Sequence, residues 1–327
     1  MLGFGNTIGS GVFTLTGVAS KFAGSAVFIG FIISGMVALM TALVFAEFSA
    51  IIPKSGSSYV YTYSTFGELP AWIVGWNQNF RYGGTAATQS RAWSAYMVQL
   101  LLGMGIVLPM WFDELKVFSI NCSPLAVFFL LFCTWITTLG TEAAGAFNNF
   151  VTSGKLIILA FIATVSFANF NIENFTPFLD EEKGIPGVIE ASTILFFGYL
   201  GFDFITTISE EAINPKRDVP RAILWSVILS MIIYVIISFA VNGVGNLAGV
   251  GSKDGETALA EIFLNIGLDW MAAVIFVCAI LGITAAAMTN LMSQSRILYS
   301  YAKDGLFFKI FKDMDPVRKV PIKGSWL

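Results

Sequence analysis

Two long hydrophobic segments of this 327-residue chain are each interrupted by glycine. The first interruption is Gly9-Ser10-Gly11, and the second extends from Gly198 to Gly201. A broken transmembrane helix exposes backbone N–H and C=O groups, for which lipid offers no hydrogen-bond partner. Such a break persists only where it lines a cavity, and a matched pair of breaks indicates the substrate site of a transporter. Because several apolar segments lie between the two breaks, they open two successive blocks of helices.

The composition excludes most other classes of protein. Hydrophobic residues make up 56% of the chain and charged residues 12%, with a mean hydropathy of +0.76, which is far too apolar for a soluble domain of this size. The chain has no His, and its three Cys lack the spacing of a metal site. No nucleophile–base set is recognisable, and no basic stretch is interleaved with aromatic residues. We therefore expect no enzyme, no cofactor, no metal and no nucleic-acid partner.

The apolar spans predict a polytopic protein whose main partner is the lipid bilayer. Eight spans are at least about as long as a bilayer requires. We expect them at residues 2–20, 25–49, 71–108, 124–141, 148–168, 187–209, 222–247 and 270–301. Most of the 18 Lys and Arg residues fall in the connections on one side, which predicts a cytoplasmic amino terminus. We expect residence in the plasma membrane rather than in a vacuolar or lysosomal membrane.

The position of the breaks also predicts that the chain is truncated at both ends. Met1 precedes the first break by only a few residues, which leaves little room for a first half-helix. A second block of helices that starts near Ile185 is expected to continue beyond Leu327.

Short motifs along the whole chain match a known family in order and spacing. They are Ile8-Gly9-Ser10-Gly11-Val12-Phe13, Ala46-Glu47-Phe48, Pro53-Lys54-Ser55-Gly56, Gly75-Trp76-Asn77, Ser90-Arg91-Ala92-Trp93-Ser94, Gly201-Phe202-Asp203, Glu210-Glu211, Asn214-Pro215, Arg296-Ile297-Leu298-Tyr299 and Asp304-Gly305-Leu306. With them the chain resembles the amino acid–polyamine–organocation superfamily, and within it the cationic amino acid transporters.

The resemblance implies a fold and an activity. The fold is an all-α polytopic membrane protein, the inverted-repeat (LeuT-like) transporter fold with discontinuous helices 1 and 6. Residues 1–327 would form one permease domain, with a first repeat at about 1–170 and an incomplete second repeat at about 185–327. The activity is secondary transport of amino acids by alternating access, with the cationic amino acids arginine, lysine and ornithine as the leading substrates.

The physics of the breaks predicts how an amino acid substrate would be held. The helix that resumes after Gly11 points free N–H groups and its positive dipole end at the gap, so Gly9, Ser10 and Gly11 suit a carboxylate. Carbonyl groups freed at Thr7 and Ile8 suit an ammonium group. The second break is predicted to complete the substrate site with Phe196, Phe197, Gly198 and Leu200. The alternative is that the glycines only allow helices to pack closely.

Lys155 is the most informative ionisable residue because it lies inside the fifth apolar span. A buried ammonium is costly, so such a residue is a functional candidate by default. The resemblance implies that its amine occupies the place of the sodium ion in sodium-coupled relatives, between the first and eighth transmembrane helices. A lysine there could lose and regain a proton, so protons are kept as a possible coupling partner. A permanent tether or a side chain that reaches the interface is the structural alternative. At the second break, Tyr199 and Phe197 are the candidate gates.

Arg81 argues against a substrate with a cationic side chain. It stands where some bacterial members of the family carry an acidic residue facing the site, and a cavity-facing Arg81 would repel a cationic side chain. A position at the membrane interface is the alternative for this residue. The other hypotheses kept open are a carrier of neutral amino acids or polyamines, a non-transporting amino acid sensor and an inactive fragment.

Overall fold

The computed structural model describes residues 2–9, 11–109, 112, 115–117, 120–180, 182–245, 247, 258–315, 318 and 320–326. Helices dominate it, and one short antiparallel strand pair lies in the connection before α7. The α-helices and strands are α1 (Leu2–Thr7), α2 (Gly11–Ala23), α3 (Val27–Ile51), α4 (Ser58–Phe66), α5 (Glu68–Gly103), β1 (Leu115–Val117), β2 (Ile120–Cys122), α7 (Pro124–Thr138), α8 (Thr141–Ala168), α9 (Gly184–Phe196), α10 (Phe204–Thr207), α11 (Pro215–Val244), α12 (Ala258–Asn265), α13 (Asp269–Lys303) and α14 (Ile322–Ser325).

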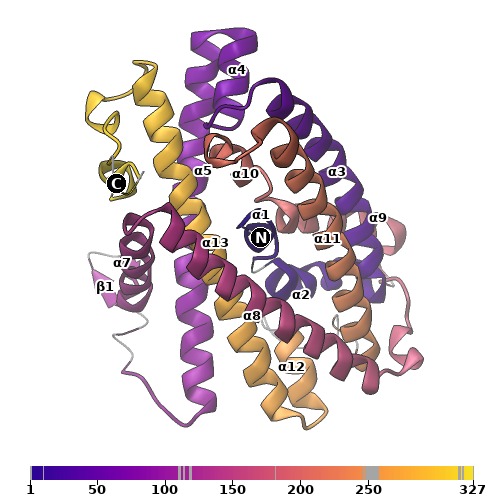
Figure 1. Cartoon of the computed structure of the whole chain (residues 1–327). Helices are drawn as coiled ribbons and strands as arrows, with labels where there is room; N and C mark the ends of the chain where they lie inside the picture. The colour runs from indigo at the N-terminus through magenta and orange to yellow at the C-terminus, as the bar shows by residue number, and fades with distance from the viewer. Residues whose placement is uncertain are drawn as a thin grey trace.

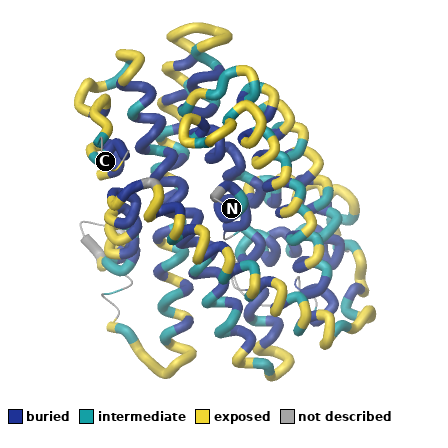
Figure 2. Tube along the Cα trace, in the orientation of Figure 1, coloured by how far each residue is buried: buried dark blue, intermediate teal, exposed yellow. Residues whose placement is uncertain are grey.

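The short helix α1 lies in the middle of the bundle and is surrounded by longer helices (Figure 1). On one side, α13 packs along α5 and is crossed by α8, while on the other side α3 packs against α9 and α11. Burial follows the same plan, because α1 is buried and the outer helices are exposed on their outward faces (Figure 2). The polar backbone at the end of α1 is therefore enclosed by protein.

Both predicted helix breaks are present. The first helix stops at Thr7 and resumes at Gly11, and the second stops at Phe196, passes through a 3-10 turn (Phe197–Tyr199), and resumes at Phe204. Between Leu200 and Asp203 the chain forms turns instead of helix. Each break follows from glycine in an apolar segment, as the sequence predicts.

The described chain contains five segments long and apolar enough to cross a membrane, against eight predicted spans. These segments are Gly3–Ile51, Glu142–Ala168, Gly184–Thr207, Pro215–Val244 and Asp269–Lys303. The first covers two predicted spans, since α2 and α3 are joined by the 3-10 turn Gly24–Ala26.

Two predicted spans differ in ways that have a physical cause. The third is continuous helix over Glu68–Gly103 and ends five residues before the predicted 108, where Gly105 takes a positive φ of 80°. It is less apolar than the five segments named above because one of its faces carries polar residues. The fourth ends at Thr138 rather than 141, because Gly140 at φ 133° separates it from α8.

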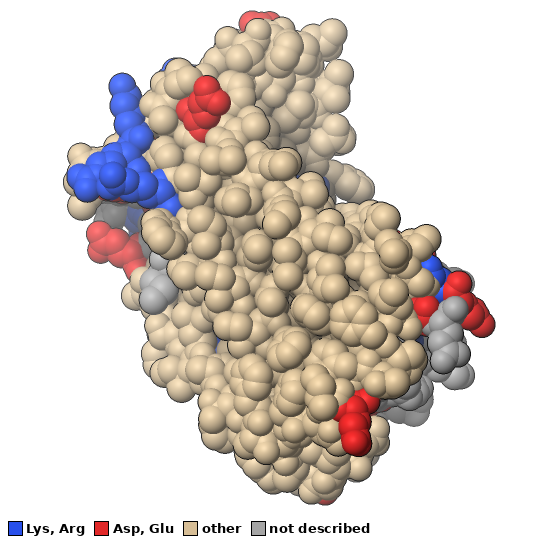
Figure 3. Space-filling model, turned by 90° about the vertical axis from the view of Figure 1, so that its right-hand side faces the viewer, with Lys and Arg blue, Asp and Glu red and all other residues tan. Residues whose placement is uncertain are grey.

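The outer surface suits a lipid environment. One face of the molecule is almost free of charge over its broad middle, and Lys, Arg, Asp and Glu appear around its margins (Figure 3). Exposed large apolar residues recur along outward helix faces, for example Met36, Met40 and Val44 on α3 at 56%, 69% and 52% exposure. A soluble protein rarely exposes so continuous an apolar surface.

Candidate functional site

The two helix breaks touch each other at a pair of glycines. A Cβ atom placed on Gly11 would lie 2.8 Å from the Cα atom of Gly198, which is closer than any side chain tolerates. The contact is backbone against backbone, so no rotamer change would relieve it. The close approach therefore requires glycine and brings the start of α2 against the end of α9.

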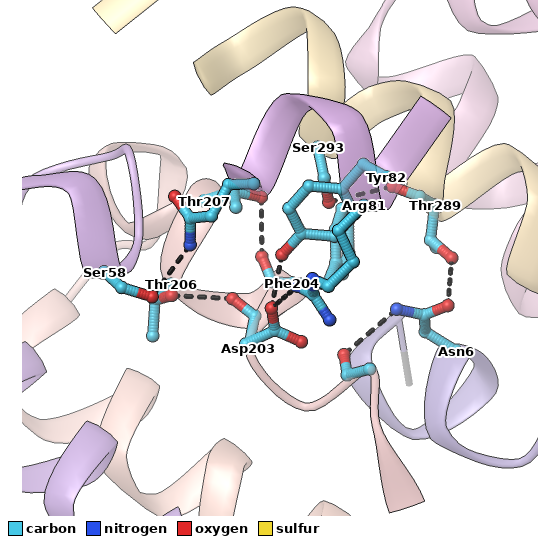
Figure 4. Close-up of polar contacts among 12 residues, drawn as sticks. Asn6, Ser58, Arg81, Tyr82, Asp203, Phe204, Thr206, Thr207, Thr289 and Ser293 are labelled. Carbon is cyan, nitrogen blue, oxygen red and sulfur yellow. Dashed lines mark hydrogen bonds and ion pairs between the residues drawn. The ribbon is translucent and has the colours of Figure 1, made fainter. Parts of the chain in front are cut away.

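The second break is held against the first by Asn6. The backbone of Leu200 is extended and Gly201 takes a φ of 129°, a region that only glycine enters without strain. The Asn6 Nδ2 donates to the Gly201 carbonyl at 3.0 Å, and the Asn6 Oδ1 accepts from the Thr289 hydroxyl at 2.6 Å. One amide side chain thus joins α1, the second break and α13 (Figure 4).

A cavity of about 330 Å³ opens between the breaks, α5 and α13. This is the low end of the size range of ligand pockets and suits one small molecule. The cavity is lined by Asn6, Thr7, Gly9, Gly11, Thr14, Leu15, Arg81, Thr85, Thr88, Gln89, Phe197, Gly198, Leu200, Gly201 and Asn290.

One side of the cavity is formed by the amino-terminal end of α2. Gly9 and Gly11 line the cavity, together with Thr14 in the first turn of α2. The first N–H groups of a 13-residue helix have no intrahelical partner and carry its positive dipole end. An anionic group in this cavity would meet those donors, while Ser10, also predicted to contribute, lies outside the described residues.

The Thr7 and Gly198 carbonyl groups already have a partner within the protein, which differs from the expectation that carbonyl groups at the breaks are free. The Tyr234 hydroxyl on α11 lies 2.6 Å from the Thr7 carbonyl and 2.9 Å from the Gly198 carbonyl. A hydroxyl carries one hydrogen, so it satisfies one of these carbonyls at a time, and each carbonyl keeps a second lone pair. Tyr234 is fully buried, and it was missed because nothing in its local sequence marks it out.

Lys155 lies behind the first break, outside the cavity. Its Nζ donates to the Gly5 carbonyl at 3.0 Å and to the Ile8 carbonyl, and the residue is completely buried. The side chain passes close to Gly282 of α13, whose added Cβ would lie 3.4 Å from the Lys155 Cδ. Lys155 therefore bridges α8 to the end of α1 beside α13.

Arg81 faces the cavity, and its charge is paired. Arg81 and Tyr82 on α5 converge on the Oδ2 of Asp203, which follows the second break (Figure 4). The Arg81 side chain keeps 36% exposure and Asp203 only 8%. The Asp203 Oδ1 is buried without a partner among the described residues. The interface position considered for Arg81 is therefore excluded.

A polar face of α5 continues the cavity wall, and the sequence reasoning missed most of it. Arg81, Thr85, Thr88 and Gln89 are spaced at i, i+4, i+7 and i+8, which places them on one face of the helix. That periodic polar stripe within an apolar span is the signal that would have found them. Opposite, the Asn290 Nδ2 on α13 donates to the Gln89 Oε1 at 3.0 Å.

The sequence model of the amino acid permease family matches residues 1–327, which is the whole chain. The chain belongs to the amino acid permease family. Its relatives are transporters rather than enzymes. They include the branched-chain amino acid permease BcaP of Bacillus subtilis (strain 168), 31% identical over 338 residues, and the methylthioribose transporter of the same organism, 33% identical over 334 residues. Cationic amino acid transporter 4 of Mus musculus is 32% identical over 338 residues.

Coverage differs between these relatives. The two bacterial alignments include 100% of this chain and 70% of each relative. The mouse alignment includes 99% of this chain and 52% of the relative, so the permease spans about half of that protein. The resemblance inferred from the motifs is confirmed at the level of the family, and the chain is an integral membrane protein.

Apart from Ser10, which lies outside the described residues, the predicted site residues of this permease divide into two groups. Those that line the cavity are Thr7, Gly9, Gly11, Phe197, Gly198 and Leu200. Those placed elsewhere are Ile8, Phe196, Lys155 and Tyr199. Ile8 is fully buried and gives its carbonyl to Lys155, and Phe196 packs against the apolar core. Tyr199, a candidate gate, is fully buried with its hydroxyl donating to the Phe31 carbonyl at 2.8 Å, whereas Phe197 is 65% exposed.

Proposed function

We propose that this permease is a secondary transporter that moves amino acids with uncharged side chains across the membrane by alternating access. The observation that carries the proposal is the contact of the two helix breaks in the wall of one small cavity. Helix breaks that line a cavity at the centre of a membrane protein mark transporter substrate sites.

The backbone of the substrate would be held by the breaks. Its carboxylate would accept hydrogen bonds from the free N–H groups at the start of α2, around Gly11. Its ammonium group would donate to the Thr7 and Gly198 carbonyls, whose second lone pairs remain after Tyr234 has bonded. Such a site recognises every α-amino acid and leaves selectivity to the rest of the cavity.

The charge of the cavity argues for an uncharged side chain. Arg81 is the one charged residue in the described lining of the cavity. Its partner Asp203 neutralises it but has no place in that lining, so a cationic side chain would meet a guanidinium and no free carboxylate. The second candidate is a cationic substrate, which the naming of the mouse relative favours.

The remaining expectations are kept as parts of the same proposal. Phe197 would gate the cavity, because it lines it and is exposed. Lys155 would couple transport to the conformation of the first break, with a proton as the open coupling ion, because its amine binds that break directly. We also propose one permease domain over residues 1–327 with the LeuT-like inverted repeat, a cytoplasmic amino terminus and residence in the plasma membrane.

Transport by purified protein in liposomes tests the proposal. Uptake of radiolabelled alanine, leucine, arginine and lysine would be measured against empty liposomes. The proposal predicts saturable uptake of alanine or leucine and little of arginine. Saturable uptake of arginine or lysine alone would overturn the side-chain assignment, and no uptake by folded, correctly inserted protein would favour a sensor or an inactive protein.

A further inference from the structure

One wall of the cavity carries a pair of amide side chains from two different helices. Gln89 lies on α5 and Asn290 on α13, 201 positions apart, and both line the cavity. The Asn290 Nδ2 donates to the Gln89 Oε1 at 3.0 Å, which fixes the two side chains relative to each other. Asn290 is 6% exposed, so the pair is a built feature of the wall rather than a mobile surface contact.

The pair presents one unused donor and one unused acceptor. The Gln89 Nε2 and the Asn290 Oδ1 have no hydrogen-bond partner in the part of the chain that the structure describes. Neither atom is among the fully buried polar atoms that lack a partner in the described chain, so both are accessible. If both amides were turned over, the Gln89 Oε1 and the Asn290 Nδ2 would take over these roles, so the complement of one donor and one acceptor is independent of the amide orientation.

A carboxamide is the side-chain group that matches this wall. Its carbonyl oxygen would accept from the Gln89 Nε2, and its NH₂ group would donate to the Asn290 Oδ1, so the three amide groups would form a closed set of hydrogen bonds. A carboxylate has no hydrogen to give to the Asn290 Oδ1. An aliphatic side chain would leave both polar atoms without partners after water has been displaced, which is costly.

We propose that Gln89 and Asn290 form the side-chain subsite of this carrier and select amino acids with a carboxamide side chain, asparagine and glutamine. This inference rests on the proposed function, because it assumes that the substrate's α-amino and α-carboxyl groups occupy the breaks. The cavity of about 330 Å³ suits one amino acid of this size.

Competition between substrates of matched shape tests the subsite. Unlabelled amino acids would be tested as inhibitors of labelled alanine uptake by protein in liposomes. Inhibition by asparagine would be compared with inhibition by leucine, and inhibition by glutamine with inhibition by methionine and by glutamate. Each pair is close in size and differs in hydrogen bonding. We expect asparagine and glutamine to inhibit at concentrations at least about tenfold lower than their partners, because a hydrogen-bonding subsite rejects analogues that lack the group. Equal inhibition by asparagine and leucine, or stronger inhibition by leucine, would overturn the inference.

Two variants and one control assign the preference to the pair. Gln89→Met and Asn290→Leu remove the amides at similar volume, and the ratio of the leucine to the asparagine inhibition constants should fall towards one. Gln294→Met makes the same chemical change one turn along α13, outside the described lining of the cavity, and should leave the ratio unchanged. An unchanged ratio in both subsite variants would contradict the assignment, and the wild-type series stands even if a variant fails to fold.

A binding measurement separates this inference from the transport proposal. Ligands that bind the folded state raise its melting temperature, so asparagine and leucine would be compared on purified protein in detergent. Stabilisation by asparagine without uptake would support the subsite and reject transport. Uptake of alanine with no preference for asparagine in either assay would keep transport and reject the subsite.

Discussion

At the scale of single residues, the account depends most on Lys155. A fully buried ammonium needs partners, and its partners are the Gly5 and Ile8 carbonyls at the end of α1. We predict that Lys155→Ala lowers uptake by more than about tenfold while the protein still reaches the membrane, because the first break loses its tie to α8. Lys323→Ala is the control, since the Lys323 side chain is 52% exposed and its ion pair with Asp313 is worth little. Normal uptake by Lys155→Ala would reject the role.

Arg81 decides the charge of the cavity. With Arg81→Gln, the Asp203 carboxylate behind the cavity wall would lose its counter-charge, and the shorter side chain would leave room for a cationic side chain to reach it. We expect the concentration of arginine that halves alanine uptake to fall by at least about tenfold, or ~1.4 kcal/mol. Arg81→Lys preserves the sign of the charge and should preserve the resistance to arginine. An unchanged response to arginine in Arg81→Gln would mean that another group excludes cations.

Local signals in the sequence located only part of the site. A lone lysine or a glycine cluster within an apolar segment is visible without the fold, so Lys155 and the glycines could be named from the sequence. Partners such as Tyr234 with Gly198, or Gln89 with Asn290, come from distant segments and depend on how the helices pack. Free carbonyls were expected at the breaks because a sequence does not show which buried donors reach them.

At the scale of helices, the glycine contact between the breaks makes a sharp prediction. Gly11→Ala would place a Cβ 2.8 Å from the Gly198 Cα, and two backbones would have to separate. We expect uptake to fall by more than about tenfold with surface expression retained. Gly84→Ala is the matched control, because a Cβ at Gly84 on α5 meets nothing within 4 Å and alanine is the better helix former. Equal uptake by the two variants would show that the breaks need not touch.

A second helix contact concerns stability. Arg296 on α13 is 4% exposed, and its Nε and Nη2 donate to the Glu211 Oε1 at 2.9 and 2.6 Å, which ties α13 to the turn after the second break. Glu211→Ala should cost roughly 1.5–3 kcal/mol of stability, measured as a lower melting temperature in detergent. Glu210→Ala removes a neighbouring exposed carboxylate and should change the melting temperature little. Equal shifts would argue that the ion pair contributes nothing.

The helices themselves could largely be predicted, and the misplaced boundaries have a common origin. Hydrophobic runs located the spans because lipid and core favour the same residues. They were less reliable for α5, whose cavity face is polar, and for α7, which stops at Thr138 before the left-handed Gly140. Helix ends depend on single backbone conformations, which hydrophobicity does not encode.

At the scale of the whole molecule, a largely uncharged outer face covers a polar centre. The breaks, the cavity and the Arg81–Asp203 pair lie inside, and charged side chains appear around the margins of the face in Figure 3. Backbone groups without helical partners are tolerated in a membrane only in such an enclosed position. The arrangement has the parts that a carrier needs: one small site, two helix breaks beside it, and a buried lysine bound to one break.

The central claim is that this permease carries amino acids with uncharged side chains by alternating access, and counterflow in liposomes tests it most directly. Liposomes would be loaded with unlabelled alanine or unlabelled arginine, and the entry of labelled alanine would be followed. If the binding site reorients faster with a bound amino acid than without one, internal alanine should accelerate the entry of labelled alanine and internal arginine should not. Acceleration by arginine alone would contradict the side-chain assignment, and no acceleration by any amino acid would contradict carrier function itself.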